Sequence, residues 1–279
     1  PRTIRNIQEQ FGFTFKKGLG QNFLTARNIL EEIVDAAEIE SGVIEVGPGF
    51  GVLTSELAQN SDKVVTIEID ERLIDVLDYT LAEYDNVKII NEDILKLDLK
   101  KVIDDEFNGE KVSIAANLPY YITTPIITKL LEEKLPIKNI VVMVQKEVAE
   151  RMSAKPSTKD YGAITVLCQY YTEPSIVANV PASLFVPPPK VDSAVLKLKV
   201  LDKPSVEVKD EGVFFRVVKA AFSQRRKTLL NCLSANFPIP KDEISTLLES
   251  IGIAPSRRGE TLSLEEFANI ADTLLQKIK

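Results

Sequence analysis

Three glycines stand close together where an apolar stretch ends: Gly47, Gly49 and Gly51 in IEVGPGFGVLT. Glycines there allow a tight turn and let backbone N–H groups approach a ligand closely. The spacing is G-x-G-x-G, unlike the G-x-G-x-x-G of dinucleotide-binding turns, and Pro48 lacks the N–H that a pyrophosphate would use. The turn therefore favours a ligand without phosphates, with a plain turn as the alternative.

Two carboxylates follow the next two apolar stretches. Glu68 ends the first of them, where a carboxylate can accept hydrogen bonds from ribose hydroxyl groups. Asp93, in NEDIL after the second, is placed to bind the amino group of an adenine. The alternatives are a solvated charge for Glu68 and a helix N-cap for Asp93. With the glycine turn, the two carboxylates indicate a cofactor that carries adenosine, bound at the carboxyl ends of the strands.

A fourth apolar stretch ends in Asn117-Leu118-Pro119-Tyr120. An aromatic exocyclic amine is a poor nucleophile because its lone pair is delocalised into the ring. The Asn117 side-chain oxygen and the Leu118 carbonyl could accept its two hydrogens and localise that lone pair. Pro119 would stiffen the loop, and Tyr120 would stack on a flipped base. The alternative interpretation is a proline turn after a strand.

The composition narrows the chemistry further. The 279 residues include no histidine, which excludes a Ser-His-Asp triad, a histidine general base and a His-ligated metal; we expect no metal. The two cysteines, Cys168 and Cys232, form no CxxC pair, which favours a reducing, cytoplasmic setting. Apolar runs fall short of the roughly 20 residues that span a bilayer, and residues 1–15 lack the apolar region of a secretory signal.

Apolar stretches alternate with amphipathic segments between residues 41 and 145, which is typical of βαβ units around a parallel sheet. Two later strands, 174–180 and 191–200, are expected to form an antiparallel hairpin at one edge. The predicted fold class is therefore α/β, with a Rossmann-like sheet. The other expected strands are 43–47, 63–69, 87–91, 111–116 and 139–145, and the expected helices of this region are 28–39, 53–59, 71–84 and 125–134.

A break near Pro204 separates this region from a small all-α domain. We place the boundary between residues 203 and 204, and assign residues 1–27 to the first domain as an N-terminal extension. The expected helices of the second domain are 213–223, 227–235, 242–251 and 264–278.

Positive charge is concentrated in the second domain, although the net charge of the chain is −7. The run from Val213 to Thr228 contains no acidic residue. If the run were one helix, its basic residues apart from Arg225 would share about a third of the circumference. Such a face favours RNA phosphates, with a solvated helix face as the alternative. Its basic residues are Arg216, Lys219, Arg225, Arg226 and Lys227.

The chain resembles, over nearly its whole length, the bacterial small-subunit ribosomal RNA adenine dimethyltransferases, known as the kasugamycin-sensitivity enzymes. Each shared motif is moderately specific, and their order and spacing together are highly specific. The motifs are KKGLGQNFL at 16–24, IEVGPGFGVLT at 44–54, TIEID at 66–70, NEDIL at 91–95, AANLPYYITTP at 115–125, VQKEVAERM at 144–152, FVPPPKVDSAV at 185–195, AAFSQRRKTLLN at 220–231 and RRGETLSLEEF at 257–267.

The resemblance implies a class I methyltransferase that depends on S-adenosylmethionine (SAM), with a C-terminal RNA-binding domain. It implies dimethylation of N6 in each of two adjacent adenosines near the 3′ end of 16S ribosomal RNA, within an immature small subunit, as part of ribosome biogenesis. We expect a monomer that binds no membrane. Phe185 resembles the family's second aromatic residue at the target base; from the residues alone, the alternative is a core phenylalanine before a proline turn. The implied SAM contacts are Asn22, Leu24, Gly47, Glu68, Asp93 and Asn117, to which the glycine turn adds Gly49.

Three other functions remain open at this point. A related family methylates large-subunit ribosomal RNA and confers macrolide resistance, but the NLPYYITTP form and the long helical tail favour the small-subunit enzyme. A ribosome-assembly factor without methylation is disfavoured by the intact glycine turn and NLPY. An NAD-dependent dehydrogenase is disfavoured by Pro48, the glycine spacing and the lack of histidine.

Overall fold

A computed structural model describes residues 11–12, 23–24 and 26–278 of the chain. The chain divides into two compact units. The first extends to Ala149 and also includes Pro174–Val200, while the second comprises Glu150–Glu173 and the chain from Leu201 onward. The second unit thus includes a segment that precedes the boundary placed at 203–204. That segment belongs there because buried side chains such as Tyr161 and Tyr170 pack into the core of the second unit.

The first unit is built on a seven-stranded sheet with the order β4-β3-β2-β5-β6-β9-β7. Strands β2 to β6 run parallel, and β9 pairs antiparallel with β6. The two late strands lie together at one edge, as the sequence predicts, and the α/β fold class is confirmed. The strands are β2 Val43–Val46, β3 Val64–Glu68, β4 Val87–Asn91, β5 Val112–Asn117, β6 Ile137–Gln145, β7 Thr172–Val180 and β9 Ser193–Val200.

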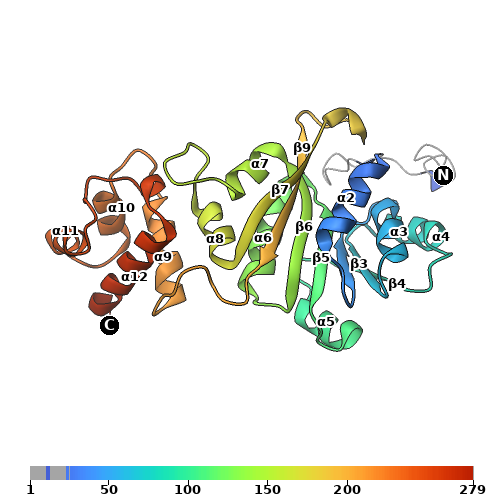
Figure 1. Ribbon diagram of the computed structural model, residues 1–279, viewed down its shortest axis with the longest axis horizontal. Helices are drawn as coiled ribbons and strands as arrows, with labels where there is room; N and C mark the ends of the chain where they lie inside the picture. The colour runs from blue at the N-terminus through green and yellow to red at the C-terminus, as the bar shows by residue number, and fades with distance from the viewer. Residues whose placement is uncertain (1–10, 13–22, 25, 279) are drawn as a thin grey trace. The chain divides into compact units, whose positions relative to one another are not determined.

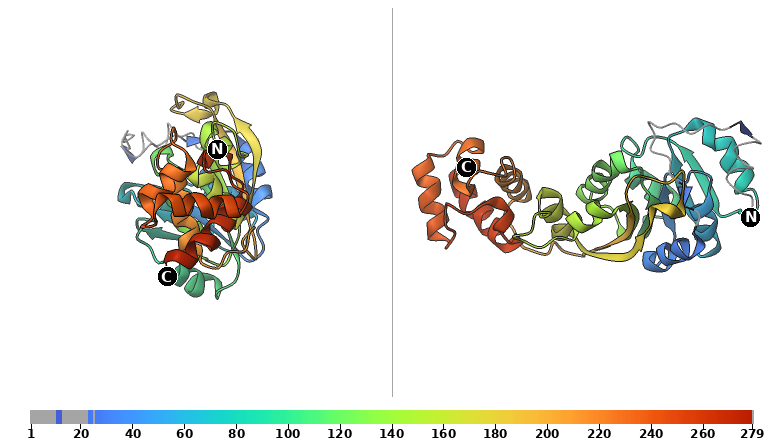
Figure 2. Two further views of the ribbon diagram at one scale, coloured as in Figure 1. Left: turned by 90° about the vertical axis from the view of Figure 1, so that its left-hand side faces the viewer. Right: turned by 90° about the horizontal axis from the view of Figure 1, so that it is seen from above.

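Helices cover both faces of this sheet (Figures 1 and 2). On one face, the apolar sides of α2 and α3 share a buried cluster with sheet residues such as Val141 and Val195. Helix α5 was not predicted, although Asp98 caps its N-terminus by accepting a hydrogen bond from the Lys101 N–H. The helices are α2 Arg27–Ala37, α3 Val52–Gln59, α4 Ile74–Thr80, α5 Leu99–Phe107 and α6 Thr123–Glu132, with α7 Lys146–Met152 after β6.

Two very short strands pair segments of the first unit that are far apart in the sequence. Strand β1 (Phe23–Leu24) pairs antiparallel with β8 (Phe185–Val186), so that Leu24 lies opposite Phe185. Neither strand was predicted, because two residues are too few to show a period of two.

The second unit is helical, as predicted, around a core that includes Phe214 and Phe267. The expected helices 213–223 and 227–235 correspond to α9 and α10, so residues 213–228 do not form the single helix on which the shared basic face would depend. Helix α9 ends at Ala221, and α10 begins at Leu229, where the Thr228 side chain caps it by accepting from the Asn231 N–H. The helices are α8 Ala163–Tyr171, α9 Glu211–Ala221, α10 Leu229–Asn236, α11 Lys241–Ser250 and α12 Leu264–Ile278.

Candidate active site

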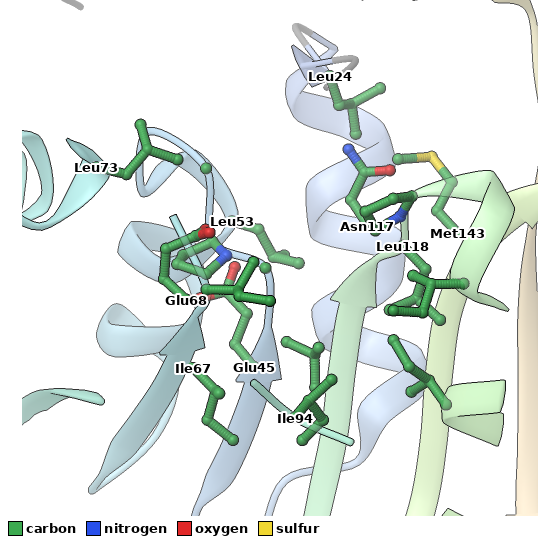
Figure 3. A pocket seen from close by; sticks show the side chains of 18 of the residues that line it. Leu24, Glu45, Leu53, Ile67, Glu68, Leu73, Ile94, Asn117, Leu118 and Met143 are labelled. Carbon is green, nitrogen blue, oxygen red and sulfur yellow. The ribbon is translucent and has the colours of Figure 1, made fainter. Parts of the chain in front are cut away.

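A pocket opens at the carboxyl ends of the parallel strands β2, β3 and β5, within the first unit (Figure 3). Glu68 from β3 and Asn117 from β5 lie on opposite sides of it (Figure 3). Ligands of open α/β sheets bind at this edge of the strands. Nine of the predicted site residues line the pocket: Leu24, Gly47, Gly49, Glu68, Asp93, Asn117, Leu118, Pro119 and Tyr120. Asn22 lies outside the described residues.

The glycine turn has a left-handed backbone at Gly47, Gly49 and Gly51, with φ angles of 70°, 58° and 80°. L-residues with a side chain rarely adopt these angles. The Gly47 N–H donates to the Ile67 carbonyl at 2.9 Å, which joins the turn to β3. The turn then leads directly into α3, whose N-cap is Gly51. The positive φ angles explain why glycine is required at these three positions.

Glu68 is a buried carboxyl group at the wall of the pocket, only 6% exposed. Burial raises its pKa to about 6, while hydrogen bonds from the backbone N–H groups of Asp70 and Gly49 oppose the rise. The Asp70 N–H donates to Oε1 at 2.8 Å. These contacts fix the orientation of the Glu68 side chain and connect it to the glycine turn, so an acceptor is held ready at the pocket.

A second buried carboxyl group, Glu45 of β2, lines the same pocket and was not predicted. It is 1% exposed, and burial raises its pKa to about 7. The Thr54 hydroxyl of α3 donates to Glu45 Oε2 at 2.5 Å. The available signal was an acidic residue at the centre of the apolar run VIEV, a place where charged residues are rarely buried without a partner.

Asp93 is both a capping residue and a residue of the pocket wall. Its Oδ1 accepts a hydrogen bond from the Leu95 N–H at 2.9 Å, so it caps the turn that follows β4. The residue also lines the pocket, and its side chain is 21% exposed. The cap holds Oδ1 and thereby orients Oδ2, which lies 3.9 Å from the Lys96 Nζ.

The Asn117–Tyr120 loop leaves the sheet at the end of β5. Leu118 is 2% exposed, and its N–H donates to the Met143 carbonyl of β6 at 3.2 Å. Tyr120 begins a short 3-10 turn, Tyr120–Ile122. Its hydroxyl lies 2.8 Å from that of Ser193, a contact that the sequence analysis did not anticipate. Burial raises the pKa of Tyr120, so its phenol stays protonated near neutral pH.

Phe185 is placed differently from the other predicted site residues. It is 2% exposed and belongs to the same buried cluster as Leu24, its partner across the β1–β8 pair. It is not among the described residues that line the pocket. Its role at the target base stays a prediction.

The predicted RNA-binding residues all belong to the second unit and are all exposed. Arg216 and Lys219 lie on α9, whereas Arg225, Arg226 and Lys227 lie in the loop between α9 and α10. The Arg216 guanidinium stands 4.5 Å from the centre of the Phe237 ring. Arg225 donates to the Lys159 carbonyl at 2.8 Å, so it also holds the loop in place.

The described residues contain no group of three or more histidine, cysteine, aspartate or glutamate side chains arranged to hold a metal ion. Over the same residues, no helix has the length and apolar character needed to cross a membrane.

Comparisons with known proteins give the family. The profile of a family described as "Ribosomal RNA adenine dimethylase" matches residues 12–276. Two proteins named "Ribosomal RNA small subunit methyltransferase A", from Bacillus mycoides (strain KBAB4) and Bacillus cereus (strain B4264), are each 55% identical to the chain over 281 residues, covering 99% of this chain and 96% of the relative.

Two solved structures support the same assignment. A dimethyladenosine transferase from Plasmodium falciparum is 30% identical with a TM-score of 0.77, covering 91% of this chain and 98% of that one. The 23S rRNA methyltransferase ErmE is 27% identical with a TM-score of 0.69, covering 91% of this chain and 100% of that one. The predicted family and enzyme class are thereby confirmed: the chain belongs to the ribosomal RNA adenine dimethylase family.

Proposed function

We propose that this chain transfers two methyl groups from SAM to N6 of each of two adjacent adenosines near the 3′ end of 16S ribosomal RNA, in an immature small ribosomal subunit. The observation that carries the proposal is that Glu68 and the Asn117–Tyr120 loop line one pocket. Glu68 would hold the ribose of SAM, and the Asn117–Tyr120 loop would receive the target adenine. The names of the 55% identical relatives support the small subunit, whereas ErmE, named for 23S rRNA, is 27% identical.

The residues present fit the adenosine portion of SAM. Glu68 is buried, oriented by the Asp70 N–H, and lines the pocket, as an acceptor for ribose hydroxyl groups must be. Asp93 Oδ1 is held by the Leu95 N–H, and Oδ2, which lies 3.9 Å from the Lys96 ammonium, would accept from an adenine amine. The apolar side chains of Ile69 and Ile94 line the same pocket and suit the faces of a purine.

The other part of the pocket would prepare the nucleophile. When bound, SAM supplies a methyl group on a positively charged sulfur, and the electron pair of the breaking C–S bond stays on that sulfur. Asn117 Oδ1 and the Leu118 carbonyl would accept the two N6 hydrogens of the adenine and direct the nitrogen lone pair at the methyl carbon. These acceptors stabilise the positive charge that develops on N6, so their effect is largest in the transition state.

The proton that N6 then loses needs no histidine. After the first transfer the positively charged N6 carries two hydrogens and after the second it carries one; each cation is strongly acidic, so water can take one proton each time. The role of the loop is therefore electrostatic and geometric, which agrees with a chain that contains no histidine.

Binding of the RNA would rest on the second unit. The basic side chains of α9 and of the loop that follows it are exposed and concentrated, although the net charge of the chain is −7. Phosphate contacts by arginine and lysine position a nucleic acid without reading its sequence. The single-stranded target would then be recognised by its shape and by unstacking of the base.

The test is methyl transfer from labelled SAM to isolated small and large subunits that lack the modification. We expect label in the small subunit only, recovered as N6,N6-dimethyladenosine. Label in the large subunit would favour the macrolide-resistance activity. Tight binding to small subunits without any transfer would favour an assembly factor and would contradict the proposal.

A further inference from the structure

The hydroxyl groups of Tyr120 and Ser193 meet across 73 residues of sequence, with 2.8 Å between their oxygens. Ser193 is the first residue of β9 and is fully buried. It pairs with Gln145, the last residue of β6. The Ser193 hydroxyl is therefore carried by the rigid sheet, whereas Tyr120 stands on a three-residue turn at the pocket.

The start of β9 is itself held from two sides. The Asp192 carboxylate accepts a hydrogen bond from the Ala182 N–H at 2.9 Å, and the Asp192 carbonyl accepts one from the Lys146 N–H at 3.0 Å. The first bond connects Asp192 to the short turn that leads into β8, and the second connects it to the first residue of α7. These bonds restrict movement of the residue before Ser193, so the partner of the Tyr120 hydroxyl has a defined position.

We infer that Ser193 is a positioning residue for methyl transfer: its hydroxyl holds the far end of the Tyr120 ring so that the ring stays in place for the target adenine. This role rests on the proposed function, in which Tyr120 stacks on that base. Tyr120 is only half-buried, so packing alone leaves its side chain room to swing about the Cα–Cβ bond. A hydrogen bond at the hydroxyl restrains that swing, and a small misplacement of a group at the reacting base costs rate.

A purely structural hydrogen bond would have a different signature. It would stabilise the fold, and its loss would lower the melting temperature without changing the rate of transfer in the folded fraction. Ser113 supplies the matched control, because it is a buried serine of the same sheet whose Oγ donates to the Ala37 carbonyl at 2.6 Å, and it does not line the pocket.

The test compares Ser193→Ala, Tyr120→Phe, the double variant and Ser113→Ala. Single-turnover methylation of unmodified small ribosomal subunits gives the rate at saturating SAM, and the concentration dependence on subunits gives the KM. Thermal melting is measured on the same preparations. We expect Ser193→Ala and Tyr120→Phe each to lose about three- to tenfold in rate. The KM of each should stay within about twofold of that of the wild-type chain. The double variant should be no slower than the slower single variant, since both remove the same bond.

Ser113→Ala should lower the melting temperature and leave the rate unchanged. Equal rates for Ser193→Ala and the unmodified chain would overturn the positioning role and leave the proposed function intact. Losses that multiply in the double variant would also overturn it, because the two hydroxyl groups would then act independently. If the unmodified chain transfers no methyl group to small subunits, the proposed function fails, and this role fails with it.

Discussion

Thr54, in the first turn of α3, donates a hydrogen bond of 2.5 Å to the carboxyl group of Glu45 at the base of the pocket. The bond joins the strand before the glycine turn to the helix after it. Glu45 is buried, and its pKa is raised to about 7, so the group carries a proton through much of the acidic range. The stability of the fold should therefore depend on the ionisation of Glu45.

For Glu45 the folded pKa, about 7, exceeds the ordinary value of 4.5, so the folded chain binds the proton more tightly than the unfolded chain. Its contribution is fully present below pH 4.5 and is lost as pH rises to about 7, on the order of 3 kcal/mol. Glu45→Gln cannot ionise, so its free energy of unfolding should fall less between pH 5 and pH 8 than that of the unmodified chain. Urea denaturation at both pH values measures this. Parallel pH profiles for the two proteins would show that the fold does not raise the pKa of Glu45.

Glu68→Ala should weaken SAM binding by roughly 1.5–3 kcal/mol, the value of hydrogen bonds to a charged group. Because the pKa of Glu68 is raised to about 6, SAM affinity of the unmodified chain should also fall as the pH drops below about 6. Calorimetric titrations at pH 5.5 and pH 7.5 measure both effects. Glu83→Ala, which removes an exposed carboxylate, is the control and should bind SAM normally. Unchanged SAM affinity in folded Glu68→Ala would remove Glu68 from the site.

Asn117→Ala should reduce kcat by about 10²–10³, equivalent to 3–4 kcal/mol, because one preorganised acceptor for the N6 hydrogens is lost. The loss should fall on kcat, since the interaction strengthens as N6 becomes positive. Single-turnover methylation of small subunits at saturating SAM measures it, with calorimetry to show that SAM affinity weakens only slightly. A wild-type rate in this variant would contradict the proposed mechanism.

Replacing Arg225, Arg226 and Lys227 by alanine should weaken binding to small subunits and flatten the log–log salt dependence of the affinity by up to ~3. Arg225 also holds the Lys159 carbonyl, so the variant that changes only Arg226 and Lys227 separates phosphate contact from loop stability. Binding is measured between 50 and 200 mM salt. SAM affinity should not move. An unaltered salt slope would identify these residues as ordinary surface.

Much of the secondary structure of the first unit could be predicted, because the spacing of apolar residues in each element shows which of its faces is buried. The strands from β2 to β6 are short β-branched runs, and α2 has apolar residues spaced for one face, Ile29, Ile33 and Ala37 among them. Burial of a strand or of a helix face is visible in the local period of the sequence. The carboxyl ends of parallel strands meet at one edge, so the glycine turn, Glu68, Asp93 and Asn117 could be assigned to one pocket before the structure was known.

The local sequence was less informative where the packing of neighbouring elements determines the position of a segment. The helices expected at 213–223 and 227–235 correspond to α9 and α10, but the basic residues of 213–228 are divided between α9 and the loop after it. The segment 150–173 precedes the late strands in sequence, yet its buried side chains complete the core of the helical unit. Periodicity describes which face of an element is buried, and does not say which partner buries it.

The sequence by itself determined the fold class, the family and the set of groups at the strand ends, because these depend on residue types and short spacings. Only the tertiary structure decided that Ser193 meets Tyr120, that Thr54 binds the buried Glu45, and that Phe185 packs with Leu24 in the core. Those pairs are formed when strands and turns pack onto one another. A few neighbouring residues encode neither the register of a strand nor the burial of a single carboxyl group.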